Sequence, residues 1–264
     1  MLLTPIDRWR APAPLAKRVS WLGEWTYAHR GLHGSNVPEN SPAAFAAAIA
    51  ARMGIECDVQ RTLDGRAAVF HDWELGRLTE ETGPISDRSA EEIEKITLSG
   101  NGDPIQSLER FLDQVAGQVP VLIEIKSRRD RRIQPLCLAV HRALEGYRGQ
   151  HAVMSFDPRV SRWFARHSRN TVRGLVVTEE NAKSLVGRWR RHSALWIASP
   201  DFLAYDIRDF PSTFAAAQRR RGLPLLCWTV RSAIHRDRAS RHADAAIAEG
   251  EGIEGAAPEE GLQG

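Results

Sequence analysis

Two acidic residues, Glu56 and Asp58, lie inside the segment IECDVQ, which otherwise has the pattern of a β-strand. Side chains alternate between the two faces of a strand, so both acids point to the same face. The segment IEIK repeats this arrangement with Glu124 and Lys126 on one face. Carboxylates of Glu56, Asp58 and Glu124 would suit a hard divalent cation, Mg2+ or Ca2+, better than zinc, since no cysteine shares their face of the strand and no close histidine pair accompanies them.

Each of these patterns also has a purely structural interpretation. Glu124 and Lys126 could form a simple ion pair, and the first segment could be a strand whose polar face meets water. The same pattern on two neighbouring strands favours a functional site over coincidence.

Basic and titratable side chains accompany the acids along the chain. The segment AHRG supplies His29 and Arg30, and His71 follows the strand that carries Glu56. Arg30 and Lys126 have the charge to hold a phosphate, while His29 and His71 titrate in the range needed for proton transfer near neutral pH. Acids, cations and histidines together indicate phosphate-ester hydrolysis.

The pair Asp64–Gly65 lies between two strand-like runs and predicts a hairpin, because a two-residue turn with positive φ favours these residue types. Folding about this turn places positions whose numbers sum to 129 opposite each other. The predicted register therefore sets His71 opposite Asp58.

Short apolar runs alternate with helical patterns along most of the chain, and this alternation must position the polar residues. Eight alternations at roughly this length favour a (β/α)8 TIM-type barrel, in which chemistry lies at the C-terminal ends of the strands. No glycine-rich dinucleotide fingerprint supports an open doubly wound sheet. The predicted strands are Thr26–Arg30, Ile55–Gln60, Val121–Lys126, Ala152–Phe156, Val172–Thr178, Leu195–Ser199, Leu225–Val230 and Ala243–Ala248. The predicted helices are Pro42–Met53, Leu108–Ala116, Pro135–Leu144, Pro158–His167, Ala182–Arg191, Pro211–Arg221 and Ala233–Arg241.

We expect one domain over residues 1–264, with two departures from a plain barrel. Residues 73–104 lack strong periodicity and predict a small insertion after the hairpin of the second strand. Residues 251–264 are rich in glycine and acid and predict a loose tail. The segment Trp9–Leu22 is expected to cover the barrel where a last helix would otherwise lie.

Composition excludes several classes of protein. The 36 basic and 33 acidic residues of the 264 leave a net charge of only +3, which argues against a nucleic-acid partner. The basic runs at 128–132 and 219–221 are explained by solvated helix ends. The sequence has no apolar run long enough to predict a membrane span. The three separated cysteines suit reduced core residues, so we expect a cytoplasmic protein; its oligomeric state stays open.

The ordered motifs together resemble the glycerophosphodiester phosphodiesterase family over nearly the whole chain. The motifs are His29–Arg30–Gly31, Pro38–Glu39–Asn40–Ser41, Glu56–Cys57–Asp58–Val59, Asp64–Gly65, His71–Asp72, Glu124–Ile125–Lys126, Ser155–Phe156–Asp157–Pro158 and Trp228–Thr229–Val230. The resemblance implies a barrel with an insertion, and hydrolysis of small glycerophosphodiesters to glycerol 3-phosphate and an alcohol, a reaction of lipid and glycerol metabolism.

The resemblance also implies roles for individual residues. His29 and His71 would be the acid/base pair, Glu56, Asp58 and Glu124 the metal ligands, and Arg30 and Lys126 would lie near the phosphate. Trp228 would contact the alcohol portion, although core packing on its apolar strand is almost as good an interpretation. The segment from Ala243 to Gly250 departs from the aspartate-proline ending common in relatives.

Other functions stay open at this point. A lysophospholipase D-type enzyme would act on lysophospholipids, and a non-catalytic barrel would bind phosphodiesters without turning them over. Neighbouring polar residues receive structural interpretations: Glu39 and Asn40 order the loop before a helix, Asp72 is an orienting or turn residue, Asp157 caps a helix, and His33 lies at the surface.

Overall fold

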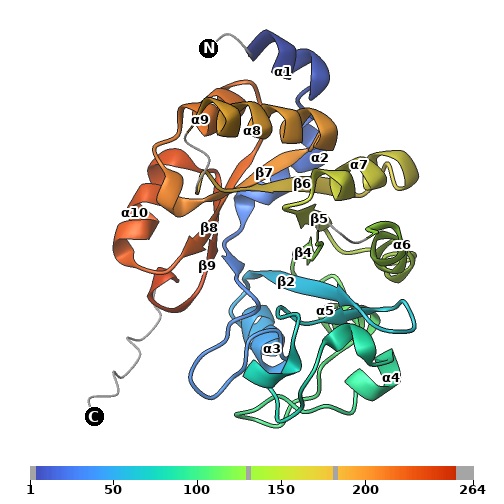
Figure 1. Ribbon diagram of the computed structural model, residues 1–264. Coiled ribbons are helices and arrows are strands. Elements are labelled where there is room, and N and C mark those ends of the chain that lie inside the picture. Colours follow the sequence, from blue (N-terminus) through green and yellow to red (C-terminus); the bar gives the residue numbers. More distant parts are fainter. Residues whose placement is uncertain (1–3, 129–131, 181–183, 254–264) are drawn as a thin grey trace.

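The computed structural model describes residues 4–128, 132–180 and 184–253. Within them, eight parallel strands close into a barrel surrounded by helices, because β1 pairs with both β2 and β9 (Figure 1). The predicted (β/α)8 barrel is confirmed. Its strands are β1 (Tyr27–Ala28), β2 (Gly54–Arg61), β4 (Val121–Ile125), β5 (His151–Ser155), β6 (Val172–Val177), β7 (Phe202–Asp206), β8 (Leu225–Val230) and β9 (Ala245–Ala248).

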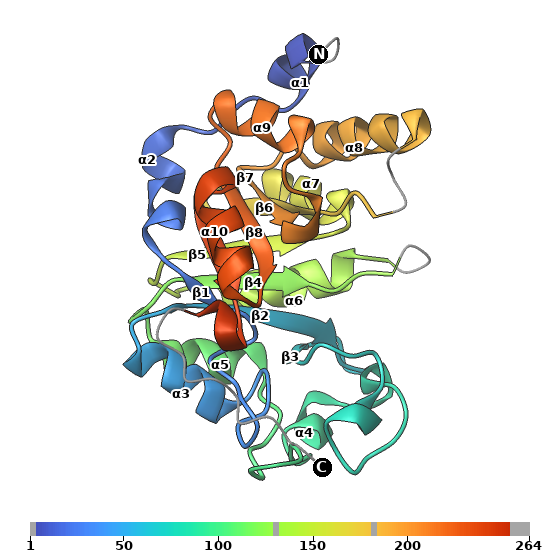
Figure 2. The same cartoon turned by 90° about the vertical axis from the view of Figure 1, so that its left-hand side faces the viewer.

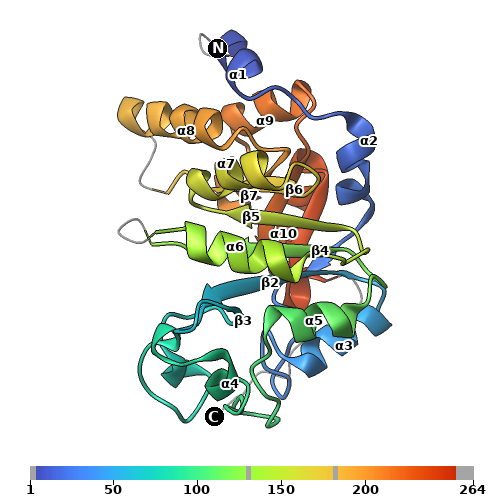
Figure 3. The ribbon, with the colours of Figure 1, turned by 90° about the vertical axis from the view of Figure 1, so that its right-hand side faces the viewer.

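Helices lie on the outer side of these strands (Figures 2 and 3). They are α3 (Pro42–Ala50), α5 (Leu108–Val115), α6 (Gln134–Ala143), α7 (Pro158–His167), α8 (Leu185–Ala198), α9 (Thr213–Arg220) and α10 (Ala233–His242). Side-chain oxygens cap most of their N-termini, which satisfies backbone N–H groups that have no partner within the helix. These caps are Ser41, Ser107, Asp157, Ser184, Ser212 and Ser232. The predicted caps at Ser41 and Asp157 are confirmed.

The predicted strand Leu195–Ser199 is wrong. Leu195 and Ala198 form the buried face of the last turns of α8, and the sixth strand of the barrel is instead β7. A short apolar run fits a buried strand and a buried helix turn equally well, so periodicity could not separate them. The start of the predicted helix at 182 lies outside the described residues.

Strand side chains alternate between the outer helices and the barrel interior. Cys57 and Val59 of β2 belong to the cluster that includes Phe45 of α3 and Phe111 of α5. Tyr27 lies inside, where its ring passes so close to Gly54 that a Cβ there would lie 2.5 Å from the ring. Glycine at position 54 is thus required by the packing inside the barrel at the N-terminal ends of its strands.

The last part of the N-terminal segment covers the N-terminal ends of the barrel strands, whereas its first helix packs against α8. The segment forms α1 (Thr4–Arg10), α2 (Ala16–Val19) and the 3-10 helix η1 (Ser20–Glu24). Trp21 and Leu22 pack in the same cluster as the interior residues Tyr27 and Phe202. Their apolar burial explains why η1 lies at the N-terminal ends of the strands.

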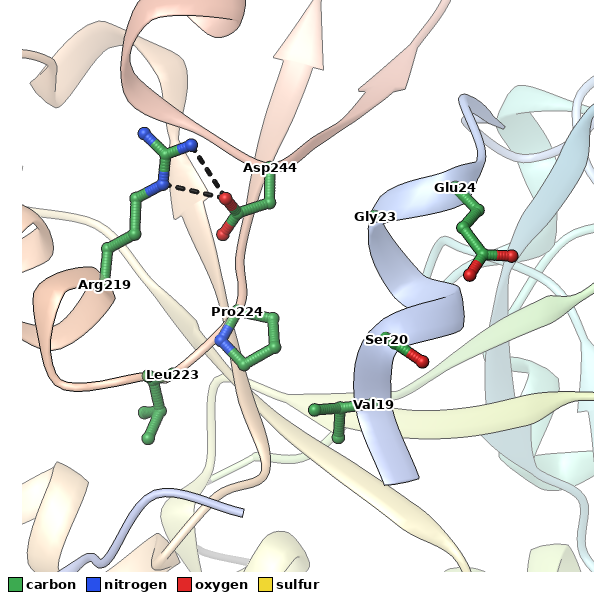
Figure 4. A pocket seen from close by; sticks show the side chains of 9 residues that line it. Val19, Ser20, Gly23, Glu24, Arg219, Leu223, Pro224 and Asp244 are labelled. Carbon is green, nitrogen blue, oxygen red and sulfur yellow. Dashed lines mark hydrogen bonds and ion pairs between the residues drawn. The ribbon is translucent and has the colours of Figure 1, made fainter. Parts of the chain in front are cut away.

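A groove of about 560 Å3 lies at this end, between η1 and the loop before β8 (Figure 4). Arg219 and Asp244 form an ion pair at 2.7 Å on one side of it, and Glu24 and Ser20 line the other side. Since the pair neutralises its own charges and lies at the opposite end from the predicted site, we assign no chemistry to this groove.

The hairpin after β2 has a different register from the prediction. β3 (Ala67–Val69) pairs antiparallel with β2 so that Val59 lies opposite Val69, and paired positions sum to 128. The N–H of Thr62 donates to the carbonyl of Arg66, and Gly65 has a φ of +81°, so the loop has three residues instead of two. A one-residue change moves His71 off the position opposite Asp58.

Residues 73–104 follow β3 and form η2 (Leu75–Arg77), η3 (Ile85–Asp87) and α4 (Ala90–Ile93). Leu75, Ile85 and Ile93 pack with Phe70 in a small apolar cluster of their own. After β9 the chain forms η5 (Gly250–Gly252), and the predicted tail from residue 254 on lies outside the described residues. In the described part of the chain, no helix has the length and apolar character that crossing a bilayer requires.

Candidate active site

Three buried carboxylates converge inside the barrel. Glu56 and Asp58 come from β2 and Glu124 from β4, and the parallel register sets Asp58 beside Glu124. One ligand atom from each of the three lies within 4.8 Å of the others. The structure therefore brings together the three acids predicted as metal ligands.

Two cations neutralise part of this negative charge. The Nζ of Lys126 lies 2.8 Å from Asp58 Oδ1 and 2.8 Å from Glu124 Oε1, and Arg30 Nε lies 3.2 Å from Asp58 Oδ2. Burial alone would raise the pKa of Asp58, but Lys126 and Arg30 outweigh it and hold that pKa below its ordinary value. Burial likewise opposes the charge of Lys126, yet Glu124 and Asp58 raise its pKa.

Glu56 lacks such a direct cationic partner. Burial, with the neighbouring charges of Asp58 and Glu124, raises its pKa well above the ordinary value. Three carboxylates against two cations leave this cluster one positive charge short. An all-oxygen donor set with unbalanced negative charge fits a hard divalent cation, so the residues present could hold one.

The loop after β1 fixes Arg30 and Asp58 together. Arg30 has a φ of +56°, and its backbone N–H donates to Glu56 Oε2 at 3.0 Å. Asn40 donates its side-chain amide to Asp58 Oδ2 at 3.1 Å, while Glu39 Oε1 accepts from Arg30 at 2.8 Å. Glu39 and Asn40, expected only to order the loop, thus also hold two residues of the site.

His71 reaches the site by a turn after β3 rather than by the strand ladder. Gln60 donates its amide to the backbone carbonyls of His71 and Asp72, which holds the turn. Nδ1 of His71 lies 2.6 Å from Asp72 Oδ1, so Nε2 faces away from that carboxylate. Burial lowers the pKa of His71, and Arg77 pairs with Asp72 on its outer side.

His29 lies between Glu56 and a fourth acid. Its Nε2 is 4.0 Å from Glu56 Oε2, and its Nδ1 hydrogen bonds to Glu249 Oε2. Glu249 directly follows β9, and its Oε1 pairs with Arg231 at 2.5 Å. His33 Nε2 lies 3.5 Å from Oε2, the oxygen that also bonds His29. Although burial opposes it, these contacts with His29 and His33 hold the pKa of Glu249 below its ordinary value.

The model of the glycerophosphoryl diester phosphodiesterase family matches residues 29–255. This span contains every residue of the site, from His29 to Glu249. The chain belongs to this family.

Curated relatives of the phosphodiesterase family match part of the chain. A glycerophosphodiester phosphodiesterase of Bacillus altitudinis is 40% identical over 100 residues, which are 38% of this chain and 37% of the relative. One from Caldanaerobacter subterraneus is 39% identical over 100 residues, or 37% of each chain. These alignments span well under half the length of the curated relatives.

Solved structures of phosphodiesterases match most of the chain. An Oleispira antarctica phosphodiesterase in complex with the product sn-glycerol-3-phosphate has a TM-score of 0.73 at 19% identity, over 85% of this chain and 92% of the other. A Thermotoga maritima glycerophosphodiester phosphodiesterase has a TM-score of 0.66 at 25% identity, over 84% and 93% of the two chains. At 19% identity, the first likeness shows the fold alone.

Trp228 of this family member is partly exposed and also packs inward. Its Nε1 donates to the carbonyl of Ala204 at 3.0 Å, and its ring meets Phe156 edge-on with centroids 5.3 Å apart. Phe156, 47% exposed, follows the end of β5. These contacts confirm the packing of the indole against the barrel, and contact between Trp228 and the alcohol portion of a substrate stays a prediction.

Sequence analysis missed Glu249 and placed His33 at the surface. Glu249 lies in the segment from Ala243 to Gly250, which departs from the aspartate-proline ending common in relatives, so the resemblance implied no role for it. The available signal was positional: an acid directly after the eighth strand of a barrel lies at the end where side chains from all strands meet. His33 lies in a loop, and only the folded chain brings it to Glu249.

Proposed function

We propose that this chain hydrolyses glycerophosphodiesters to glycerol 3-phosphate and an alcohol. The observation that carries the proposal is the convergence of His29 with the buried acids Glu56, Asp58 and Glu124 at one end of a barrel of this family. The product bound to the Oleispira antarctica relative supports a small phosphate-bearing substrate.

In this proposal Arg30 and Lys126 hold the phosphate. Both side chains are largely buried and already face Asp58, so they present fixed positive charge where charge develops on the phosphoryl oxygens. A divalent cation, Mg2+ or Ca2+, held by Glu56, Asp58 and Glu124 would add further positive charge there when bound.

His29 and His71 divide two proton transfers. One imidazole takes a proton from the nucleophile, which is either water or the substrate's own glycerol hydroxyl acting through a cyclic phosphate. The other gives a proton to the alcohol oxygen as its bond to phosphorus breaks. Glu249 and Asp72 each hold one ring nitrogen, which leaves the other nitrogen for the reaction.

A panel assay tests this function. Protein stripped of metal is incubated with several glycerophosphodiesters and one lysophospholipid, with and without Mg2+ or Ca2+. The products measured are glycerol 3-phosphate from the diesters and lysophosphatidic acid from the lysophospholipid. We expect metal-dependent release from the glycerophosphodiesters. Turnover of the lysophospholipid alone would support the lysophospholipase D-type alternative, and binding without turnover would support a non-catalytic barrel.

Replacement of Glu249 tests its part in positioning His29. Glu249→Ala is expected to lower kcat by about 10- to 100-fold with little change in KM. This range is typical of residues that orient a metal ligand or a catalytic side chain through a hydrogen bond. Glu249→Asp keeps the carboxylate and should recover part of the loss. Glu251→Ala, which removes a nearby exposed acid, serves as the control. Equal loss in the alanine and aspartate variants would count against a carboxylate role.

The cytoplasm is our proposed location. Cys57, Cys137 and Cys227 are buried and free, which suits a reducing compartment.

A further inference from the structure

A second cavity, of about 390 Å3, adjoins the site, and the charged side chains that line it are basic. Four cations line it, and none of the described residues that line it is an acid. These cations are Arg61 at the end of β2, Lys126 after β4, and Arg128 and Arg132 before α6. We call this cavity the arginine pocket.

Within the part of the chain that the structure describes, the three arginines lack the neutralising partners that other arginines of this end possess. Arg30 and Arg77 both pair with Glu39, but Arg61, Arg128 and Arg132 form no ion pair with any described acid. Arg128 instead lies over the ring of Trp73, with its guanidinium carbon 4.3 Å from the ring centroid. The pocket therefore carries positive charge that the described chain does not balance.

The arginine pocket opens on the His71 side of the site. Lys126 belongs to both, since its Nζ contacts Asp58 and Glu124 while its side chain lines the pocket. Gln60, another lining residue, donates its amide to the backbone carbonyl of His71. A group that leaves the phosphate toward His71 would enter this pocket.

We propose that the arginine pocket binds an anionic group on the alcohol portion of the substrate, and this rests on the proposed diester hydrolysis. The substrate class is then a glycerophosphodiester whose alcohol carries its own phosphate. Trp73 and Leu136 give the pocket an apolar wall for the carbon skeleton of that alcohol, and its volume lies within the range of small-molecule sites. A cationic alcohol such as choline would meet like charges there.

A matched pair of substrates tests the proposal: glycerophosphoinositol and glycerophosphoinositol 4-phosphate, which differ by one phosphate. We expect kcat/KM to be at least about tenfold higher for the phosphorylated substrate, since hydrogen bonds to charged groups are worth about 10- to 100-fold and part of the pocket is exposed. Added salt should reduce the ratio.

Three variants assign the effect to the pocket. Arg61→Gln and Arg132→Gln should each lower the ratio of the two kcat/KM values by about tenfold. Arg220→Gln, on the exposed side of α9, removes the same charge elsewhere and should leave the ratio unchanged. A wild-type ratio near one would overturn the proposal and leave the proposed function standing, and a high ratio that both pocket variants retain would overturn the assignment to this pocket.

Binding of the alcohol alone keeps the test independent of turnover. Titration calorimetry compares inositol 4-phosphate with inositol on the intact protein, and we expect the phosphate to tighten binding and Arg132→Gln to weaken it again. If neither diester is hydrolysed, the proposed function fails; equal binding of both alcohols would then overturn the pocket as well.

Discussion

Alanine in place of His29 or His71 is expected to lower kcat on a natural glycerophosphodiester by about 100- to 10,000-fold, the range typical of general acid or base catalysis. A natural alcohol is a poor leaving group and needs a proton as its bond to phosphorus breaks. The nucleophile must lose a proton on the opposite side. Neither step has another well-placed imidazole, because His33 faces Glu249.

The two histidines should differ in their dependence on the leaving group. The arginine pocket lies on the His71 side, so His71 is the expected acid and His29 the expected base. Burial lowers the pKa of His71, which makes its protonated form a stronger proton donor. Nitrophenolate needs little protonation, so a nitrophenyl phosphodiester should restore most of the rate of His71→Ala.

His29→Ala should remain slow on both substrates, because the transfer of a proton from the nucleophile to His29 is needed whatever group leaves. Rescue of His29→Ala instead of His71→Ala would reverse the two roles. Equal losses of both variants on both substrates would contradict the division, and small losses would contradict the catalytic assignment itself. Circular dichroism and thermal unfolding of each variant check that the fold survives.

The acid cluster could be predicted because it depends on local rules. Glu56 and Asp58 share a face by the period of a strand, and Glu124 joins them because neighbouring parallel strands bring the same end of each strand together. The helix start at Ser41 followed from side-chain capping in the same way. Such features can be predicted from a few consecutive residues once the fold class is known.

Features that depend on distant or ambiguous contacts escaped prediction. The predicted register of the hairpin was wrong because Asp64–Gly65 also suits a three-residue loop. The length of that loop is set by the pairing of Thr62 with Arg66. The run at 195–199 completes a helix because its apolar face packs on the barrel. Glu249 and His29 are 220 positions apart, and closure of the barrel alone brings them into contact.

Glu56→Gln is expected to reduce both divalent-metal affinity and kcat/KM by more than about 100-fold, since changes to groups that only orient metal ligands already cost about 10- to 100-fold. The amide keeps the shape of the side chain and removes its charge, so the buried cluster then has two carboxylates against two cations. Glu80→Gln, at an exposed position in the insertion, is the matched control.

The same variant should change the pH dependence of stability in a defined direction. In metal-free protein the folded chain keeps a proton on Glu56 at pH values where the unfolded chain, with the ordinary pKa of 4.5, has lost it. The folded state then binds more protons than the unfolded state, so this group makes the free energy of unfolding fall as pH rises from about 4.5 through the raised pKa. Glutamine cannot titrate, and Glu56→Gln should lose less stability over this interval.

Urea unfolding with a chelator present, followed across this pH interval, measures that difference. Added Mg2+ or Ca2+ should then stabilise the wild type, because a ligand that binds only the folded state raises the free energy of unfolding, and should do little for Glu56→Gln. Since the amide relieves the charge imbalance without restoring the metal site, the variant should be stable and inactive together. Full wild-type activity in metal-free buffer with excess chelator, or equal metal stabilisation of both proteins, would show that these three acids do not hold a cation needed for the reaction.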